Sequence, residues 1–173
     1  DVCQFTAISE KLSPDEVADV MNSIFDRMTA IIVDNGGTID KYEGDAIIAF
    51  WNAPLDVPDH AQRGVRSALR CQRRLAELRP IYSERFGHEI HARIGLNTGE
   101  VVVGNMGSDQ RFDYTVLGDV VNLSSRLEGQ SKAYGITTII SSYTADEVMD
   151  YSKRRKISID EAIKWLNPNI NDV

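Results

Sequence analysis

The sequence predicts a single α+β domain, and three observations support that class. Segments with apolar residues at helical spacing alternate with short, mostly apolar runs that are bounded by turn residues. The length of 173 residues fits one domain, and the sequence contains neither an internal repeat nor a convincing linker. Hydrophobic residues make up 42% of the chain, which is enough to bury one core.

The first clear element is a helix that begins at Ser13. Ser13 is a good N-cap, Pro14 suits the first helical position, and Glu16 completes a capping box. The apolar residues that follow recur at helical spacing and form one core-facing stripe: Val17, Val20, Met21, Ile24, Phe25, Met28 and Ile31. Gly36 and Gly37 end the helix, because glycine tolerates the left-handed conformation at a C-cap.

The next elements are two strands and a second helix. Residues 38–42 and 45–51 predict strands joined by a tight turn at Glu43 and Gly44, and the second strand is mostly apolar, as if covered on both faces. A proline-rich loop then leads to a helix over roughly residues 59–78.

The second half of the chain alternates strands and helices. Strands are expected at 90–98 and 101–104 around the turn 98–100, followed by a polar loop at 107–109 and an extended piece at 114–117. Asp119 is expected to cap a helix that runs to about residue 130, and residues 136–140 predict one more strand. The last thirty residues hold two short helical patterns, the second with a capping box at 158–161 and a stop at Pro168.

Charge and motifs exclude several classes of function. The formal net charge of −7 argues against a nucleic-acid partner, which requires a basic face, but it allows a small phosphorylated substrate that binds through a metal ion. The two cysteines, Cys3 and Cys71, form no CxxC pair and suit a reducing compartment. The sequence has no P-loop, HExxH or GxSxG motif and no apolar run long enough to span a bilayer.

Two aspartates are candidate metal ligands. Asp1 precedes a glycine-free turn, residues 2–6, whose backbone N–H groups can hold phosphate oxygens. Asp45 begins an apolar strand, where a carboxylate is costly without a partner such as Mg²⁺. Taken alone, each is more simply interpreted as an ordinary turn or cap aspartate.

Three further polar residues suggest nucleotide binding. Asn122 and Arg126 lie four residues apart on one helix face, where an amide and a guanidinium together can receive a sugar and a phosphate. The simpler alternative is a solvated helix face. Lys41 precedes the tight turn, and a lone strand lysine is usually a solvated edge residue.

Four segments together resemble the class III adenylate and guanylate cyclase domain over residues 1–142. They match in order and spacing, and they read DVCQFT (1–6), TIDKYEGDA (38–46), RIGLNTGE (93–100) and YTVLGDVVNLSSRL (114–127). The resemblance implies a ferredoxin-like βαββαβ core, with helices packed on a sheet rich in antiparallel strands. It also implies a head-to-tail homodimer with its active sites at the subunit interface.

The resemblance further implies roles for individual residues in converting ATP to cyclic AMP and pyrophosphate. Two divalent ions, Mg²⁺ or Mn²⁺, would be bound by Asp1 and Asp45 with the backbone carbonyl of Val2. The remaining roles are substrate binding by the turn (Cys3, Gln4, Phe5, Thr6), purine recognition by Lys41 and Thr115, ribose orientation by Asn122, and charge stabilisation at the α-phosphate by Arg126.

The choice of base follows from hydrogen-bond polarity. Adenine presents an acceptor at N1 and donors at its amino group, which Lys41 and the Thr115 hydroxyl complement. Guanine presents the opposite pattern, and guanylate cyclases of the family typically carry glutamate at the lysine position. ATP is therefore the expected substrate, with a guanylate cyclase as the alternative. Threonine at position 115 resembles a subgroup that is often activated by bicarbonate.

The sequence departs from the family pattern at both ends. Most of the first strand that normally precedes the metal aspartate is missing. After residue 142 the usual basic closing hairpin is replaced by an atypical helical segment, 143–173, in which residues 153–156 are all basic and lead into a predicted helix over 159–166. These departures leave open a second hypothesis, an inactive cyclase-like module for dimerisation or nucleotide sensing. We expect a cytoplasmic domain, whether or not its parent is membrane-anchored, with a regulatory or sensor domain elsewhere in the parent chain.

Overall fold

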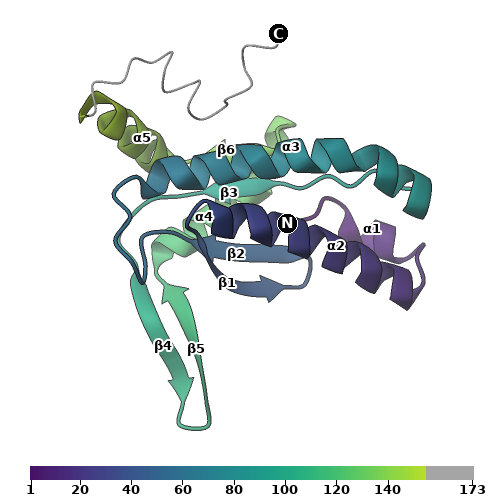
Figure 1. Ribbon diagram of the computed structural model, residues 1–173, viewed down its shortest axis with the longest axis horizontal. Coiled ribbons are helices and arrows are strands. Elements are labelled where there is room, and N and C mark those ends of the chain that lie inside the picture. Colours follow the sequence, from purple (N-terminus) through teal and green to yellow (C-terminus); the bar gives the residue numbers. More distant parts are fainter. Residues whose placement is uncertain (155–173) are drawn as a thin grey trace.

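The computed structural model describes residues 1–154 (Figure 1). The helical pattern predicted over 159–166, its capping box and its stop at Pro168 lie outside the described residues. The elements, in chain order, are α1 (Phe5–Ser9), α2 (Pro14–Asp34), β1 (Thr38–Glu43), β2 (Ala46–Phe50), α3 (His60–Phe86), β3 (Ile94–Leu96), β4 (Val102–Ser108), β5 (Arg111–Leu117), α4 (Asp119–Tyr134), β6 (Thr138–Ile140) and α5 (Ser142–Arg154). None of the described helices is both long and apolar enough to cross a membrane.

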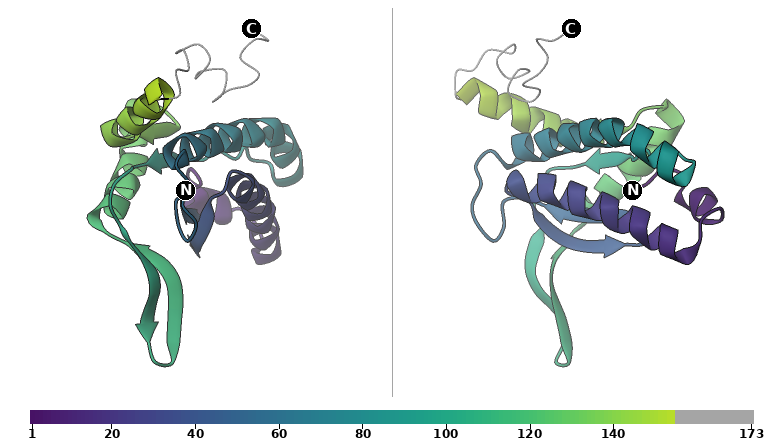
Figure 2. Two further views of the ribbon diagram at one scale, coloured as in Figure 1. Left: turned by 60° about the vertical axis from the view of Figure 1, so that its left-hand side comes forward. Right: turned by 45° about the vertical axis from the view of Figure 1, so that its right-hand side comes forward.

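The α+β class predicted from the sequence is confirmed, and the first half of the chain follows the βαββαβ order. Val2 forms an antiparallel bridge with Ala92 next to β3, so the amino end contributes the first extended segment of that order. The described strands form three two-stranded sheets: β1 with β2 antiparallel, β3 with β6 parallel, and β4 with β5 antiparallel. Helices α2 and α3 lie side by side and cover one side of the strands (Figures 1 and 2).

Helix α2 forms where the capping box predicts it. The Ser13 N–H donates to the Glu16 carboxylate at 2.8 Å, and the Glu16 N–H donates to the Ser13 hydroxyl at 3.3 Å. These two bonds satisfy two of the backbone donors that the first turn of a helix leaves free. The buried side of α2 carries Val20, Met21, Ile24, Met28 and Ile32, which pack into the main core together with α3.

Helix α3 is longer than predicted. The sequence places its end near residue 78, yet the helix continues to Phe86 with Pro80 inside it. Proline removes one backbone hydrogen bond from a helix interior. Leu78, Tyr82 and Phe86 are all buried in the core, and the burial of this stripe outweighs that cost.

Strands β3 and β4 do not form the hairpin that their spacing suggests. Within residues 1–154, β3 pairs with β6 and β4 pairs with β5. The predicted polar loop at 107–109 is mostly strand and turn, and the β4–β5 hairpin projects away from the rest of the domain (Figure 1). Its register runs from Val102 opposite Leu117 to Ser108 opposite Arg111.

Helix α4 packs directly on β3 because residue 95 is glycine. A Cβ added at Gly95 would overlap the Ser124 carbonyl oxygen and the Glu128 backbone, so a larger residue would push α4 away from β3. The predicted cap is wrong: Gly118 holds the N-cap position, no side-chain hydrogen bond caps this end among the described residues, and Asp119 is the first helical residue. Helix α4 therefore begins at Asp119, and its place over β3 positions the site residues that it carries.

Candidate active site

Asp1 and Asp45 line the same cavity, whose volume is about 280 Å³. Two hydrogen bonds tie the amino end to the strand that leads into β3: the Arg93 N–H donates to the Asp1 carbonyl at 2.9 Å, and the Cys3 N–H donates to the His91 carbonyl at 2.7 Å. Asp45 follows Gly44, whose left-handed conformation makes the β1–β2 turn. We call this space the aspartate cavity.

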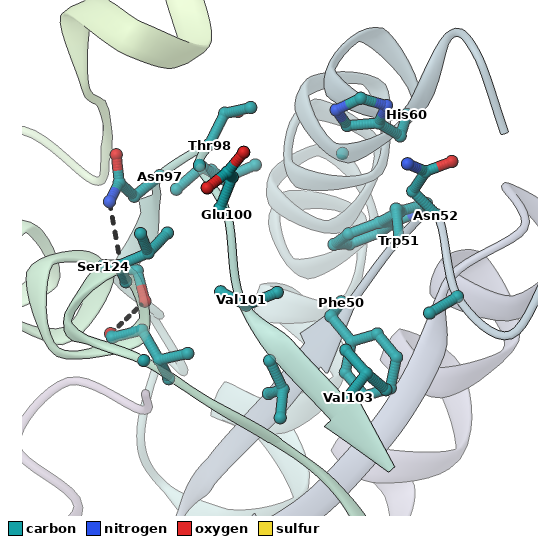
Figure 3. A pocket seen from close by; sticks show the side chains of 18 of the residues that line it. Phe50, Trp51, Asn52, His60, Asn97, Thr98, Glu100, Val101, Val103 and Ser124 are labelled. Atoms are coloured by element: carbon teal, nitrogen blue, oxygen red, sulfur yellow. Dashed lines mark hydrogen bonds between the residues drawn. The ribbon is translucent and has the colours of Figure 1, made fainter. Parts of the chain in front are cut away.

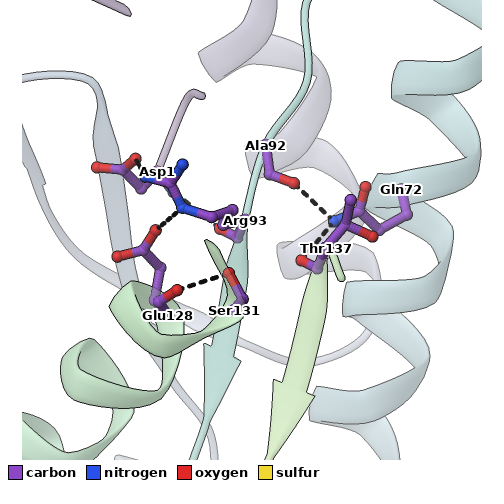
Figure 4. A network of polar contacts seen from close by, with 7 residues as sticks. All are labelled: Asp1, Gln72, Ala92, Arg93, Glu128, Ser131 and Thr137. Carbon is purple, nitrogen blue, oxygen red and sulfur yellow. Dashed lines mark hydrogen bonds and ion pairs between the residues drawn. The ribbon is translucent and has the colours of Figure 1, made fainter. Parts of the chain in front are cut away.

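A cation that the sequence-based hypothesis did not include lies beside Asp1. The Arg93 guanidinium donates to the Asp1 carboxylate at 2.9 Å and to the Glu128 carboxylate of α4 at 2.5 Å (Figure 4). The Glu128 hydrogen bond raises the pKa of Arg93, and the negative charges of Glu128 and Asp45 add to that effect. Arg93 opens the RIGLNTGE segment, so the motif contained a signal for it. Glu128 lies just beyond the quoted motif and had none.

The aspartate cavity suits metal ions that take most of their ligands from a substrate. Among the described residues there is no group of three or more His, Cys, Asp or Glu side chains able to hold an ion. Mg²⁺ typically binds through one or two carboxylates and completes its shell with waters and phosphate oxygens. Asp1 and Asp45 match that donor set, and a nucleoside triphosphate would supply the rest.

The turn after Asp1 leads into α1. The Val2 side chain is buried in the core, and the Cys3 N–H is already used in the bond to His91. Gln4 adopts a left-handed conformation with φ of 57°, which is uncommon for a residue other than glycine. The first hydrogen bond of α1 runs from the Ile8 N–H to the Gln4 carbonyl at 3.1 Å, so the N–H groups of Phe5 and Thr6 lie at the free start of the helix.

Lys41 and Thr115 are in contact, although 74 positions separate them in the sequence. The Lys41 ammonium, from β1, donates to the Thr115 hydroxyl, from β5, at 3.3 Å. Thr115 is buried, whereas the Lys41 side chain is 48% exposed. One residue of the pair is therefore fixed in the fold, and the other reaches the surface.

Asn122 and Arg126 are exposed on α4. The Arg126 guanidinium lies 3.6 Å from the Asp119 carboxylate, about two helical turns away, which is a surface ion pair. The described residues that line the aspartate cavity include none of Lys41, Thr115, Asn122 and Arg126. We refer to these four as the reading residues.

A second, larger cavity of about 1030 Å³ lies between the loop after β2 and the turn 97–100 (Figure 3). Of the described residues that line it, none is a predicted site residue. Asn97 donates through its side-chain amide to the Val120 carbonyl at 3.0 Å, and this bond holds the turn against α4. The Asn97 bond and the close approach of Gly95 to α4 give the RIGLNTGE segment a structural role in joining β3 to α4.

The family is decided by a sequence profile. The profile described as adenylate and guanylate cyclase catalytic domain matches residues 1–163. The chain belongs to this family. Its members generally use divalent metal ions.

Individual cyclases agree with this assignment. Adenylate cyclase 1 of Rhizobium meliloti (strain 1021) is 36% identical over 94% of the chain, but the chain spans only 24% of that protein. Two solved structures match over most of the domain. The guanylyl cyclase Cya2 is 39% identical, with a TM-score of 0.77 over 85% of this chain and 74% of that one. The adenylyl cyclase CyaB from P. aeruginosa is 32% identical, with a TM-score of 0.78 over 87% and 77%.

Proposed function

We propose that this cyclase domain converts ATP to 3′,5′-cyclic AMP and pyrophosphate. The names of its relatives divide between adenylyl and guanylyl cyclases, so they do not decide the base. The observation that supports ATP is the contact between the Lys41 ammonium and the Thr115 hydroxyl. The ammonium can donate to adenine N1 while the hydroxyl oxygen accepts from the 6-amino group. Guanine presents a donor at N1, from which the Lys41 ammonium cannot accept. The Thr115 hydroxyl can donate as well as accept, so Lys41 carries the discrimination between the two bases.

The chain's own residues would act on different parts of the nucleotide. Asp1 and Asp45, with the Val2 carbonyl, would bind two divalent ions, Mg²⁺ or Mn²⁺. When bound, such ions activate the ribose 3′-hydroxyl and neutralise the departing pyrophosphate. The turn at residues 3–6 would bind the triphosphate at the start of α1, with the N–H groups of Gln4, Phe5 and Thr6 holding phosphate oxygens while the Cys3 N–H keeps its bond to His91.

The remaining contacts concern the sugar and the α-phosphate. Asn122 would orient the ribose so that its 3′-hydroxyl is in line with the leaving group. Arg126 would stabilise the charge that develops at the α-phosphate, an effect typically worth about 2.7–4 kcal/mol for one well-placed donor. Arg93 contacts Asp1, and the charge of Asp45 helps to raise the Arg93 pKa. We propose Arg93 as an additional phosphate ligand once Asp1 binds a metal ion.

We propose that each active site is shared between two copies in a head-to-tail homodimer. None of the reading residues lines the aspartate cavity of its own copy, which supports a site that a second copy completes. The β4–β5 hairpin also exposes Val102, Phe112 and Leu117, each more than half exposed, and a partner would cover this apolar surface. In a two-fold dimer the same surfaces meet twice and form two equivalent sites.

The regulation and setting of the domain are further parts of the proposal. The chain covers a minor part of the length of its curated relatives, which supports a regulatory or sensor domain elsewhere in a parent protein.

A location in the cytoplasm suits a domain that consumes ATP. Activation by bicarbonate is proposed from Thr115 alone. The alternatives are a guanylate cyclase and an inactive module for dimerisation or nucleotide sensing.

The test is cyclic nucleotide formation by the purified domain with Mg²⁺ or Mn²⁺ and either ATP or GTP. Wild type should prefer ATP, and Lys41→Glu should reduce that preference at least about tenfold, because a carboxylate would face the adenine N1 lone pair. Lys11→Glu reverses an exposed charge outside β1 and is the matched control. It should leave the preference for ATP over GTP unchanged. Equal turnover of both nucleotides by wild type would contradict adenylate specificity. No turnover of either would favour the inactive module.

A further inference from the structure

Asp40 occupies an irregular position in β1. The register pairs Ile39 with Ala49 and then Lys41 with Ile48, so two steps along β1 correspond to one step along β2. Asp40 is the extra residue of a β-bulge. Neighbouring side chains on a regular strand point to opposite faces of the sheet, and a bulge locally disrupts that alternation and re-aims a side chain. The bulge explains how two consecutive residues, Asp40 and Lys41, can contact each other.

The Asp40 carboxylate is buried beside the Lys41 ammonium. Its side chain is 3% exposed, and Oδ2 lies 3.5 Å from Lys41 Nζ. Among residues 1–154, the other oxygen, Oδ1, has no hydrogen-bond partner although it is buried. A buried carboxylate with one oxygen left without a hydrogen-bond partner is costly for folding. The fold tolerates that cost at the residue next to the one expected to contact the purine.

The Lys41 ammonium therefore has two fixed neighbours. Asp40 Oδ2 lies 3.5 Å from Nζ, and Thr115 Oγ1 accepts a hydrogen bond from it at 3.3 Å. A lysine side chain has several rotatable bonds, and a half-exposed one would otherwise sample many conformations. An ammonium group has three donors, so two fixed neighbours leave one N–H to point at a ligand.

We propose that Asp40 is a positioning residue that holds the Lys41 ammonium beside Thr115 and thereby sets the preference for adenine over guanine. The proposal rests on the proposed function, since it concerns the same purine contact. Asp40 does not touch the nucleotide. It acts through Lys41, by restricting the ammonium to the place where the third N–H meets an acceptor at adenine N1.

The experiment compares Asp40→Leu and Asp40→Asn with wild type. Affinities for 3′-deoxy-ATP and 3′-deoxy-GTP with Mg²⁺, which bind but cannot cyclise, are measured by calorimetry, and kcat and KM are measured with ATP and GTP. Both variants should lose ATP preference by about tenfold, mainly through affinity and KM. The Tm of Asp40→Leu should not fall, because removing a buried carboxylate leaves only the half-exposed Lys41 without its partner.

Two comparisons separate positioning from a general structural role. Asp34→Asn, at the exposed end of α2, should leave the preference unchanged. In a Lys41→Met background, adding Asp40→Leu should have no further effect on preference, because the group that Asp40 positions is gone.

The outcomes distinguish this inference from the proposed function. Unchanged ATP preference in both Asp40 variants would overturn the inference, and so would an equal additional loss in the Lys41→Met background. Binding that prefers the ATP analogue and depends on Asp40, but without turnover, would uphold the inference and overturn only the cyclase activity. Failure of wild type to bind either analogue would overturn both.

Discussion

The aspartate cavity and the reading residues are organised in opposite ways. Around the cavity, contacts between distant parts of the chain fix Asp1: Asp1, Arg93 and Glu128 form one connected network across the amino end, the segment before β3, and α4. Among the reading residues only Thr115 is buried, and Asn122 and Arg126 are exposed on one helix. In the aspartate cavity, contacts within one chain hold Asp1 in place. Asn122 and Arg126 instead point to solvent, which is the arrangement expected of side chains that bind another molecule.

The largest expected effect on cyclase activity comes from a substitution in the aspartate cavity. Asp45→Asn should lower cyclase activity by a factor on the order of 1000, because a neutral amide is a poor ligand for a divalent ion. Activity is measured across a wide range of Mg²⁺ and Mn²⁺ concentrations. Asp56→Asn, in the exposed loop after β2, is the control and should retain full activity with the same Tm. Substantial activity in Asp45→Asn would remove Asp45 from the metal site.

Mixing two inactive variants tests whether the two regions meet across a dimer. Asp45→Ala damages the aspartate cavity, and Arg126→Ala damages the reading residues. In a mixed dimer one site carries both lesions and the other carries neither. With random pairing about half of the dimers are mixed, so activity should recover to about a quarter of wild type. Cyclic AMP is measured after co-expression or co-refolding.

Subunit exchange must be verified independently, for example with two differently tagged copies. Mixing two preparations of the same variant gives the background. If exchange is proven and no activity returns, the two regions work within one chain and the shared-site proposal is wrong.

A smaller effect on stability and activity is expected at Gly95, where β3 packs against α4. Gly95→Ala would force α4 away from β3, and such overpacking typically costs about 1–3 kcal/mol of stability. The Tm should fall by several degrees, and activity should fall further than the Tm alone explains, since α4 carries Glu128, Asn122 and Arg126. Gly129→Ala on the same helix is the control, because no described atom lies within 4 Å of its added Cβ. That variant should be slightly more stable. Equal stability of both variants would refute the close-packing account.

The smallest expected effect concerns bicarbonate. If Thr115 marks the bicarbonate-activated subgroup, added bicarbonate should raise turnover by about twofold, through the small coupling free energies typical of effectors. The measurement keeps pH and ionic strength constant and uses matched chloride. A flat response would separate Thr115 from bicarbonate and leave its role in base recognition untouched.

Local sequence signals predicted most helices and strands. They did not predict features that depend on packing between distant parts of the chain. The capping box at Ser13 and the β1–β2 turn are local signals, and both were found. The end of α3 was missed because the burial of Tyr82 and Phe86 overrides Pro80. The parallel pairing of β3 with β6 depends on a helix crossover that no local pattern reports.

The candidate site shows the same division. The spacing of motifs pointed to the aspartates and the reading residues, although their roles stay predictions until the variants are measured. The residues that contact these site residues could not be predicted from the sequence. Glu128 reaches Arg93 across 35 positions, and the bulge at Asp40 depends on how β1 pairs with β2. Neither contact produces a periodic or compositional pattern in the sequence.

The β4–β5 hairpin leaves and rejoins the domain at one place, since Val102 is paired with Leu117 at its base. Thr115 and Val116 near the base are buried, whereas the part of the hairpin beyond the Asn105–Tyr114 pair is mostly exposed, so this outer part is an appendage whose length the core does not sense. Evolution or an engineer can shorten or lengthen it in steps of two residues per strand, which keep each remaining side chain on its own face. Thr115 lies near the base, opposite Gly104, so the tip can change while the purine contact stays in place. If the hairpin contacts a partner copy, as proposed, exchanging tips between related cyclases would alter which copies associate without altering the nucleotide that they bind.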